Sequence, residues 1–115
     1  MPHINTNNDI PGIRGLMEFR PEIAKALNEL AQALLVDNAS LSRSERELIA
    51  SFVSSRNECL FCMTTHGAIA ANLPGCDDDL VAEVWKDYTA ANLSDKMMKL
   101  CIAAKAISKT SVVKI

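Results

Sequence analysis

Two cysteines and a histidine stand close together near the middle of the chain. Cys59, Cys62 and His66 follow one another at spacings of three and four residues. On an α-helix, at about 100° per residue, these spacings place all three side chains within about 60° of arc. A dithiol beside an imidazole is suited to redox chemistry, because the thiolate is the reactive form of cysteine and histidine can accept the thiol proton.

The two cysteines are expected to differ in reactivity. Cys62 and His66 are four residues apart, which brings Cβ atoms on a helix to about 5–6 Å. Cys59 lies two turns from His66, at a rise of roughly 10 Å, so the histidine favours Cys62 as the activated thiol. A helix N-terminus lowers a thiol pKa, which favours Cys59 instead, although the charge of Glu58 next door opposes this effect. We give the specific base more weight than the dipole.

A disulfide between Cys59 and Cys62 is feasible under one condition. It requires Cβ atoms about 3.5–4.5 Å apart, which is less than the usual i,i+3 separation on a helix. The bond would therefore be strained unless Cys59 leaves helical geometry. A strained and accessible disulfide is readily reduced, which suits a catalytic cycle better than a structural link.

Two other interpretations use the same residues. A CxxC pair is often half of a zinc site, with His66 as a third ligand and Cys76 or Cys101 as a fourth. No second CxxC or HxxxH follows at zinc-finger spacing, so no metal is expected. Cysteines also pack as small apolar residues, and this structural role is the one expected for Cys76 and Cys101.

The elements that position these side chains are expected to be helices. Hydrophobic residues make up 49% of the 115 residues but aromatic residues only 4%, so the core must be aliphatic, which suits packed helices. We expect one all-α domain over residues 1–115, with an N-terminal arm over 1–15 and a short extended tail over 108–115.

Five helices are expected from capping residues and apolar periodicity. Their ranges are about Pro21 to Val36, Ser42 to Ser55, Asn57 to Ala71, Asp77–Asp79 to Tyr88, and Ser94 to Ala106. Ser42 and Glu45 form a plausible capping box, and Asn57 is the expected N-cap of the helix that carries the cysteines. The expected apolar positions are Ile23, Leu27, Leu30 and Leu34 on the first helix, Leu48, Ile49, Phe52 and Val53 on the second, and Leu80, Val81, Val84, Trp85 and Tyr88 on the fourth. Glu47, Ser51 and Ser54 form a polar flank, so Glu47 borders the core.

Charge and hydropathy exclude several classes of protein. The net charge is −2 with no run of Lys or Arg, so binding to nucleic acid is not expected. Met1 to Asp9 shows no basic segment followed by an apolar one, and no run of about 18 apolar residues occurs, so neither secretion nor a membrane partner is expected. A cytoplasmic protein with reduced thiols is the resulting prediction.

Four of these residues resemble a known motif. The motif is that of the alkylhydroperoxidase D (AhpD)-like proteins of the carboxymuconolactone decarboxylase superfamily. The chain resembles it in the order and spacing Glu47, eleven residues, Cys59, two residues, Cys62, three residues, His66. The resemblance covers roughly residues 10 to 105. Further segments that resemble the peroxidase-related branch are 11–16 (PGIRGL), 19–22 (FRPE), 27–30 (LNEL) and 41–47 (LSRSERE).

The resemblance implies a fold and a reaction. It implies an all-helical domain with a central antiparallel helical hairpin, assembled as a homo-oligomer (dimer, trimer or hexamer). Cys62 would attack a peroxide and become sulfenic acid, Cys59 would resolve it to a disulfide, and Glu47 and His66 would relay protons. The reductant would be a dithiol partner, either a lipoylated or a thioredoxin-like protein, and no cofactor is implied.

The chain departs from the family pattern at Phe61. Better-characterised members carry a histidine directly before the second cysteine, so the identity of the peroxide substrate stays open here. Members of the branch often continue with further helices, and this chain resembles a short form. Decarboxylation proceeds in members without the cysteine pair and is therefore not expected. A redox sensor or dithiol-exchange protein without turnover is the alternative function.

Overall fold

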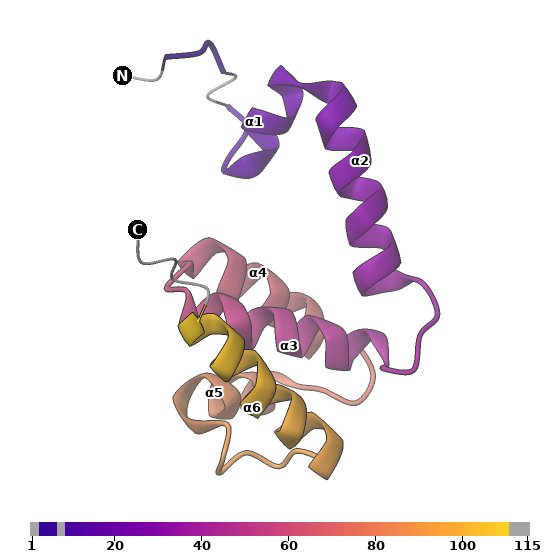
Figure 1. Ribbon diagram of the computed structural model, residues 1–115, viewed down its shortest axis with the longest axis vertical. Coiled ribbons are helices and arrows are strands. Elements are labelled where there is room, and N and C mark those ends of the chain that lie inside the picture. The colour runs from indigo at the N-terminus through magenta and orange to yellow at the C-terminus, as the bar shows by residue number, and fades with distance from the viewer. Residues whose placement is uncertain (1–2, 7–8, 111–115) are drawn as a thin grey trace. The chain divides into compact units, whose positions relative to one another are not determined.

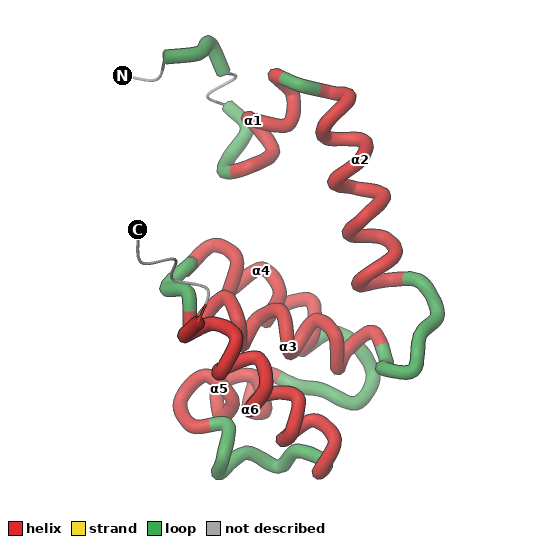
Figure 2. The backbone as a smooth tube through the Cα atoms, viewed as in Figure 1, coloured by secondary structure: helices red, strands yellow, loops and turns green. Residues whose placement is uncertain are grey.

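The computed structural model describes residues 3–6 and 9–110. This part of the chain folds into α-helices joined by loops and contains no strand, so the expectation of an all-α fold is confirmed (Figures 1 and 2). The chain divides into two compact units, residues 1–37 and 38–115, and each is described by itself. No helix in the described part of the chain is both long and apolar enough to cross a membrane.

The first unit contains α1 (Ile13–Phe19), α2 (Pro21–Ala31) and a π-helical turn, η1 (Gln32–Val36). The predicted helix from Pro21 to Val36 is confirmed in extent, with Pro21 at its first position. The predicted arm over residues 1–15 is wrong at its end, because α1 begins at Ile13. Gly12 stands at the N-cap with φ 64°, a conformation that suits glycine, so this glycine starts a helix instead of continuing a loop.

The apolar stripe of the first unit is not covered in the described structure. α2 has no buried residue. The stripe side chains are between 40% and 59% exposed, and they are Ile23, Leu27, Leu30 and Leu34. The predicted periodicity is therefore present, but it forms a surface and not part of a core.

The second unit contains α3 (Arg43–Arg56), α4 (Leu60–Ala71), α5 (Asp78–Asp87) and α6 (Asp95–Thr110). The capping box of α3 is confirmed: Ser42 Oγ accepts from the Glu45 amide at 3.2 Å, and the Ser42 amide donates to Glu45 Oε2 at 2.8 Å. Asp77 caps α5 by accepting from the Leu80 amide at 2.8 Å. Ser94 Oγ likewise accepts from the Met97 amide at the start of α6. Three of the four helices in this unit thus begin at a capping residue that the sequence predicts.

Two predicted boundaries are wrong. The cysteine helix begins at Leu60, and Asn57 is the C-cap of α3 and not the N-cap of α4. The tail predicted from residue 108 is still helical through Thr110, and Ser108 Oγ donates to the Ala104 carbonyl one turn earlier. The remainder of that predicted tail, 111–115, lies outside the described residues.

The core of the second unit lies between the α3–α4 hairpin and the two following helices. α3 and α4 run antiparallel side by side, as Figure 1 shows, joined by the short segment 57–59. The predicted faces of α3 and α5 contribute to the core, although Ile49, Val53, Leu80, Trp85 and Tyr88 are only half-buried. The buried apolar residues are Leu48, Phe52, Ala70, Val81, Val84, Ala91, Met97 and Cys101.

Candidate functional site

A Schellman motif connects α3 to the cysteines. Glu58 adopts the left-handed conformation at φ 57°. Its amide donates to the Ser55 carbonyl at 3.2 Å, and the amide of Cys59 donates to the Ser54 carbonyl at 3.0 Å. These are the two hydrogen bonds of the motif, which usually places glycine where Glu58 stands. The chain therefore reverses at Glu58 and delivers Cys59 outside helical geometry.

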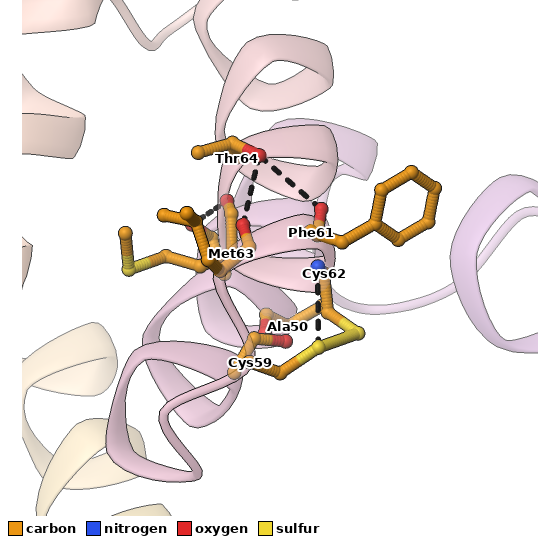
Figure 3. The surroundings of a disulfide bond; sticks show 9 residues. Ala50, Cys59, Phe61, Cys62, Met63 and Thr64 are labelled. Carbon is orange, nitrogen blue, oxygen red and sulfur yellow. Dashed lines mark hydrogen bonds between the residues drawn. A yellow bond between two sulfur atoms is a disulfide. The ribbon is translucent and has the colours of Figure 1, made fainter. Parts of the chain in front are cut away.

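Cys59 is the N-cap of α4. Its backbone is extended (φ −90°, ψ 92°), and its Sγ accepts from the Cys62 amide at 3.3 Å. The two cysteines are joined by a disulfide, with Cα atoms 5.4 Å apart, within the usual range for such bonds (Figure 3). The condition stated from the sequence, that Cys59 must leave the helix, is met. The expectation that Cys59 lies inside the first turn is wrong by one position.

Apolar side chains flank the disulfide at the surface. Leu60 is 70% exposed and Phe61 is 50% exposed, whereas both cysteines are half-buried. Figure 3 shows the Phe61 ring extending away from α4 and the Met63 side chain extending to the opposite side. Thr64 Oγ1 donates to the Leu60 carbonyl one turn earlier at 2.8 Å, so this hydroxyl is bonded within α4. The disulfide thus lies beside a small exposed apolar surface.

Glu47 and His66 form a hydrogen-bonded pair across the hairpin. His66 Nδ1 lies 2.6 Å from Glu47 Oε2. The Glu47 side chain is 3% exposed, and that of His66 is 27% exposed. A buried carboxylate requires a partner, so Nδ1 is assigned as the donor to Glu47. Nε2 is then the nitrogen that can exchange a proton with another group.

Ser51 fixes the register between α3 and the first turns of α4. Its hydroxyl donates to the Met63 carbonyl at 2.9 Å and accepts from Trp85 Nε1 of α5 at 2.8 Å. The side chain is fully buried. Sequence reasoning placed Ser51 on a polar flank and Trp85 in the core, but it did not pair them. One feature of the sequence could have indicated this contact: Ser51 follows Glu47 by one helical turn, on a face that borders the core.

Gly67 allows α4 to approach its neighbours closely. A Cβ at this position would lie 2.6 Å from Trp85 Cζ2, 3.0 Å from Val81 Cγ1 and 3.1 Å from Ser51 Oγ. A side chain here would displace Trp85 or Ser51. Glycine directly after His66 therefore helps to bring this histidine to the depth of the buried Glu47.

The remaining cysteines stand apart from this constellation. Burial raises the pKa of the Cys76 thiol above its ordinary value, and the nearby carboxylates of Asp77 and Asp78 add to the effect. Burial alone raises the pKa of the Cys101 thiol. Among residues 3–6 and 9–110, no group of three or more His, Cys, Asp or Glu residues could hold a metal ion. The zinc alternative therefore finds no ligand set in this part of the chain.

The fold and the site define a class of protein, an all-α chain with a CxxC disulfide at a helix N-terminus and, on the same hairpin, a buried glutamate bonded to a half-buried histidine. The model of the carboxymuconolactone decarboxylase family matches residues 21–106, which is most of the chain, and the chain belongs to this family. Neither a comparison with curated proteins nor one with solved structures found a match.

Proposed function

We propose that this protein is a thiol-dependent peroxidase of the AhpD-like type, acting in antioxidant defence. The observation that carries the proposal is the Cys59–Cys62 disulfide on the same hairpin as the hydrogen-bonded Glu47–His66 pair. A disulfide between neighbouring half-buried cysteines is the product expected after a peroxide has been reduced. Membership of the carboxymuconolactone decarboxylase family supports this reaction class, because the resemblance to its AhpD-like branch rests on these four residues.

The first step consumes the peroxide. The Cys62 thiolate attacks one oxygen of ROOH, an S–O bond forms, and the O–O bond breaks. The sulfur is oxidised by two electrons to sulfenic acid, and the alkoxide that leaves takes up a proton to become ROH. His66 Nε2 first accepts the thiol proton from Cys62 and then returns it to the leaving alkoxide. Glu47 holds Nδ1–H and is a positioning residue.

The second step closes the disulfide. The Cys59 sulfur attacks Cys62–SOH, water leaves, and the Cys59–Cys62 bond forms. The position of Cys59 supports its role as resolving thiol, because its Sγ already accepts the Cys62 amide and needs no large movement. A dithiol, lipoylated or thioredoxin-like, then reduces the bond and becomes a disulfide itself. A compartment that keeps such dithiols reduced is required, and we infer the cytoplasm.

The surface beside the disulfide supports docking of such a reductant. Leu60 and Phe61 are exposed apolar side chains directly between the two cysteines in sequence. The hydrocarbon part of a lipoyl group or an apolar protein surface would bury them. Phe61→Ser should then raise the KM for the reductant and leave the rate of the first peroxide turnover unchanged.

We also propose that the chain forms homo-oligomers through α2 and η1. The stripe of exposed aliphatic residues along these two elements has spacings of four, three and four, typical of the seam between paired helices. Size-exclusion chromatography with light scattering should give a multiple of 12.5 kDa. Leu27→Glu should shift the mass toward the monomer, whereas Lys25→Glu, on the same helix but off the stripe, should not. A monomeric wild-type chain would contradict this proposal.

The central test is reaction of the reduced protein with hydrogen, cumene and t-butyl hydroperoxides in stopped flow. Cys62→Ser should abolish oxidation, whereas Cys59→Ser should give one burst and a trapped sulfenate on Cys62. The opposite outcome for the two variants would show that Cys59 attacks the peroxide and Cys62 resolves the sulfenic acid. If none of the peroxides oxidises the wild-type protein faster than free cysteine, the peroxidase proposal is wrong. A single oxidation without turnover in the presence of a reductant would favour the redox-sensor alternative.

A further inference from the structure

A cavity of about 340 Å³ opens in the second unit, lined by residues of all four helices and the end of α5. Its apolar lining includes the buried Phe52 and Val84 and the half-buried Trp85 and Tyr88. The Phe52 and Tyr88 rings pack edge to face with centroids 5.1 Å apart, which fixes this part of the wall. We call this cavity the Trp85 pocket. Its volume is at the lower end of the range for small-molecule sites, which is about 300–1,000 Å³.

Positive charge dominates the lining of the Trp85 pocket. Arg56, Lys86 and Lys105 contribute to it, against the single carboxylate of Asp87. None of the three cations forms a salt bridge in the described part of the chain. Lys105 is half-buried, with Nζ 5.8 Å from the centre of the Tyr88 ring.

The carboxylate of Asp87 is already engaged. Its Oδ1 accepts from both the amide and the hydroxyl of Thr89. These hydrogen bonds, with a smaller contribution from Lys105, hold the pKa of Asp87 below its ordinary value. Asp87 therefore stays ionised and neutralises at most one of the three cations, so the pocket keeps a net positive charge.

We propose that the Trp85 pocket binds a small organic carboxylate with an apolar body. The apolar body would cover Trp85 and Tyr88, and the carboxylate would pair with Lys105 and the exposed Arg56 and Lys86 at the rim. A neutral molecule of the same shape would leave these cations unpaired, and an inorganic anion would leave the aromatic wall uncovered. The aromatic wall and the three cations together therefore determine the class of ligand. Binding requires no thiol chemistry, so it is independent of the peroxidase proposal.

The pocket also borders the redox site through Met63. This residue lines the cavity, and its amide donates to the Cys59 carbonyl at 2.9 Å. In Figure 3 its side chain points to the side of α4 opposite Phe61, so the pocket and the exposed Phe61 lie on different sides of this helix. A bound carboxylate would therefore leave the apolar surface beside the disulfide accessible.

Trp85 is the only tryptophan of the chain, so its fluorescence reports on the pocket directly. The protein is titrated with 3-phenylpropionate and with 3-phenylpropanol, which has the same body but no charge. We expect the carboxylate to bind about fivefold more tightly, which is the most that one partly exposed ion pair allows, and the difference to shrink in 0.5 M NaCl. Equal affinity of the two compounds, or no binding of either, would overturn the proposal.

Two variants locate the effect. Lys105→Met should lower the affinity for the carboxylate about fivefold and leave that for the alcohol unchanged. Lys99 lies on the same helix but does not line the cavity. Lys99→Met should therefore change neither the affinity for the carboxylate nor that for the alcohol. Calorimetric titration repeats the measurement without relying on Trp85. If Lys105→Met and the rim variant Lys86→Met both bind the carboxylate like the wild-type protein, the proposed site is wrong.

Discussion

Glu47 and His66 are nineteen residues apart in sequence, yet the carboxylate and the imidazole lie 2.6 Å apart across the α3–α4 hairpin. The contact depends on the antiparallel register that Ser51 fixes by its hydrogen bond to the Met63 carbonyl. The Glu47 side chain is buried, so its hydrogen-bond partner is the imidazole of His66 and not bulk water. This pair gives the imidazole one defined orientation on α4, the helix that Cys59 caps and that carries Cys62.

Glu47→Gln should slow the oxidation of Cys62 by peroxide about a hundredfold. An amide can still contact Nδ1, but it no longer fixes the tautomer that leaves Nε2 as a base, and a positioned general base is worth about 10²–10⁴ in rate. The rate of sulfenate formation is measured across pH, and the pH profile should shift along with the rate. Glu45→Gln, a neighbouring glutamate of α3 that only caps the helix, is the matched control. Equal rates for both variants would show that Glu47 has no part in the reaction.

Gly67→Ala should destabilise the protein by about 1–3 kcal/mol, because the added methyl group would overlap Trp85 and crowd Ser51. The hydrogen bond from Trp85 to Ser51 should break, so the tryptophan emission should shift together with the urea midpoint. Ala68→Gly, the next residue of α4 and an exposed one, controls for the change in helix propensity. An unchanged midpoint for Gly67→Ala would mean that α4 can move away from α5 at little cost.

Glu58→Gly should stabilise the protein slightly, by up to about 1 kcal/mol. A left-handed conformation costs an L-residue about 1–2 kcal/mol, and part of the gain is offset by the greater freedom of glycine in the unfolded chain. Glu58→Ala removes the same carboxylate but keeps the Cβ, so it should not stabilise. Thermal unfolding of the oxidised protein compares the two variants. A loss of stability in Glu58→Gly would show that the carboxylate matters more than the backbone conformation.

Cys76 and Cys101 should alkylate slowly in the folded, reduced protein. Burial raises both thiol pKa values above the ordinary value of 9.0, so less thiolate is present at any given pH. Iodoacetamide at pH 8 should therefore label Cys59 and Cys62 first, and peptide mass spectrometry identifies the order. In denaturant all four cysteines should react at similar rates. Early labelling of Cys101 would contradict the burial found here.

The same shifts predict how stability depends on alkaline pH. A thiol with a raised pKa binds its proton more tightly in the folded state than in the unfolded one. The stabilising contribution is therefore complete below about pH 9 and is lost as the pH rises toward the folded-state pKa. Urea unfolding at pH 8 and pH 10 should show a loss that is smaller in Cys101→Ala than in the parent chain.

Local sequence determined most of the helices and the residue types of the site. Ser42 with Glu45 and Asp77 with the Leu80 amide are contacts between near neighbours, so a capping signal is sufficient to predict them. The spacing of Cys59, Cys62 and His66 likewise predicted one face of one helix, although Cys59 is the N-cap of that helix and not a member of it. Glu47 was expected at the edge of the core because its position follows from the period of α3.

Tertiary structure decided where α4 begins and what His66 contacts. The Schellman motif places Glu58 where glycine is usual, so no glycine marked the turn between α3 and α4, and the start of α4 was predicted too early. The pairing of Ser51 with Trp85 joins residues 34 positions apart, and it depends on the close approach that Gly67 permits. Periodicity describes one helix at a time, whereas these contacts depend on the register and distance between helices. For that reason the sequence provided a dithiol, a histidine and a glutamate, and only the packed hairpin joined the last two.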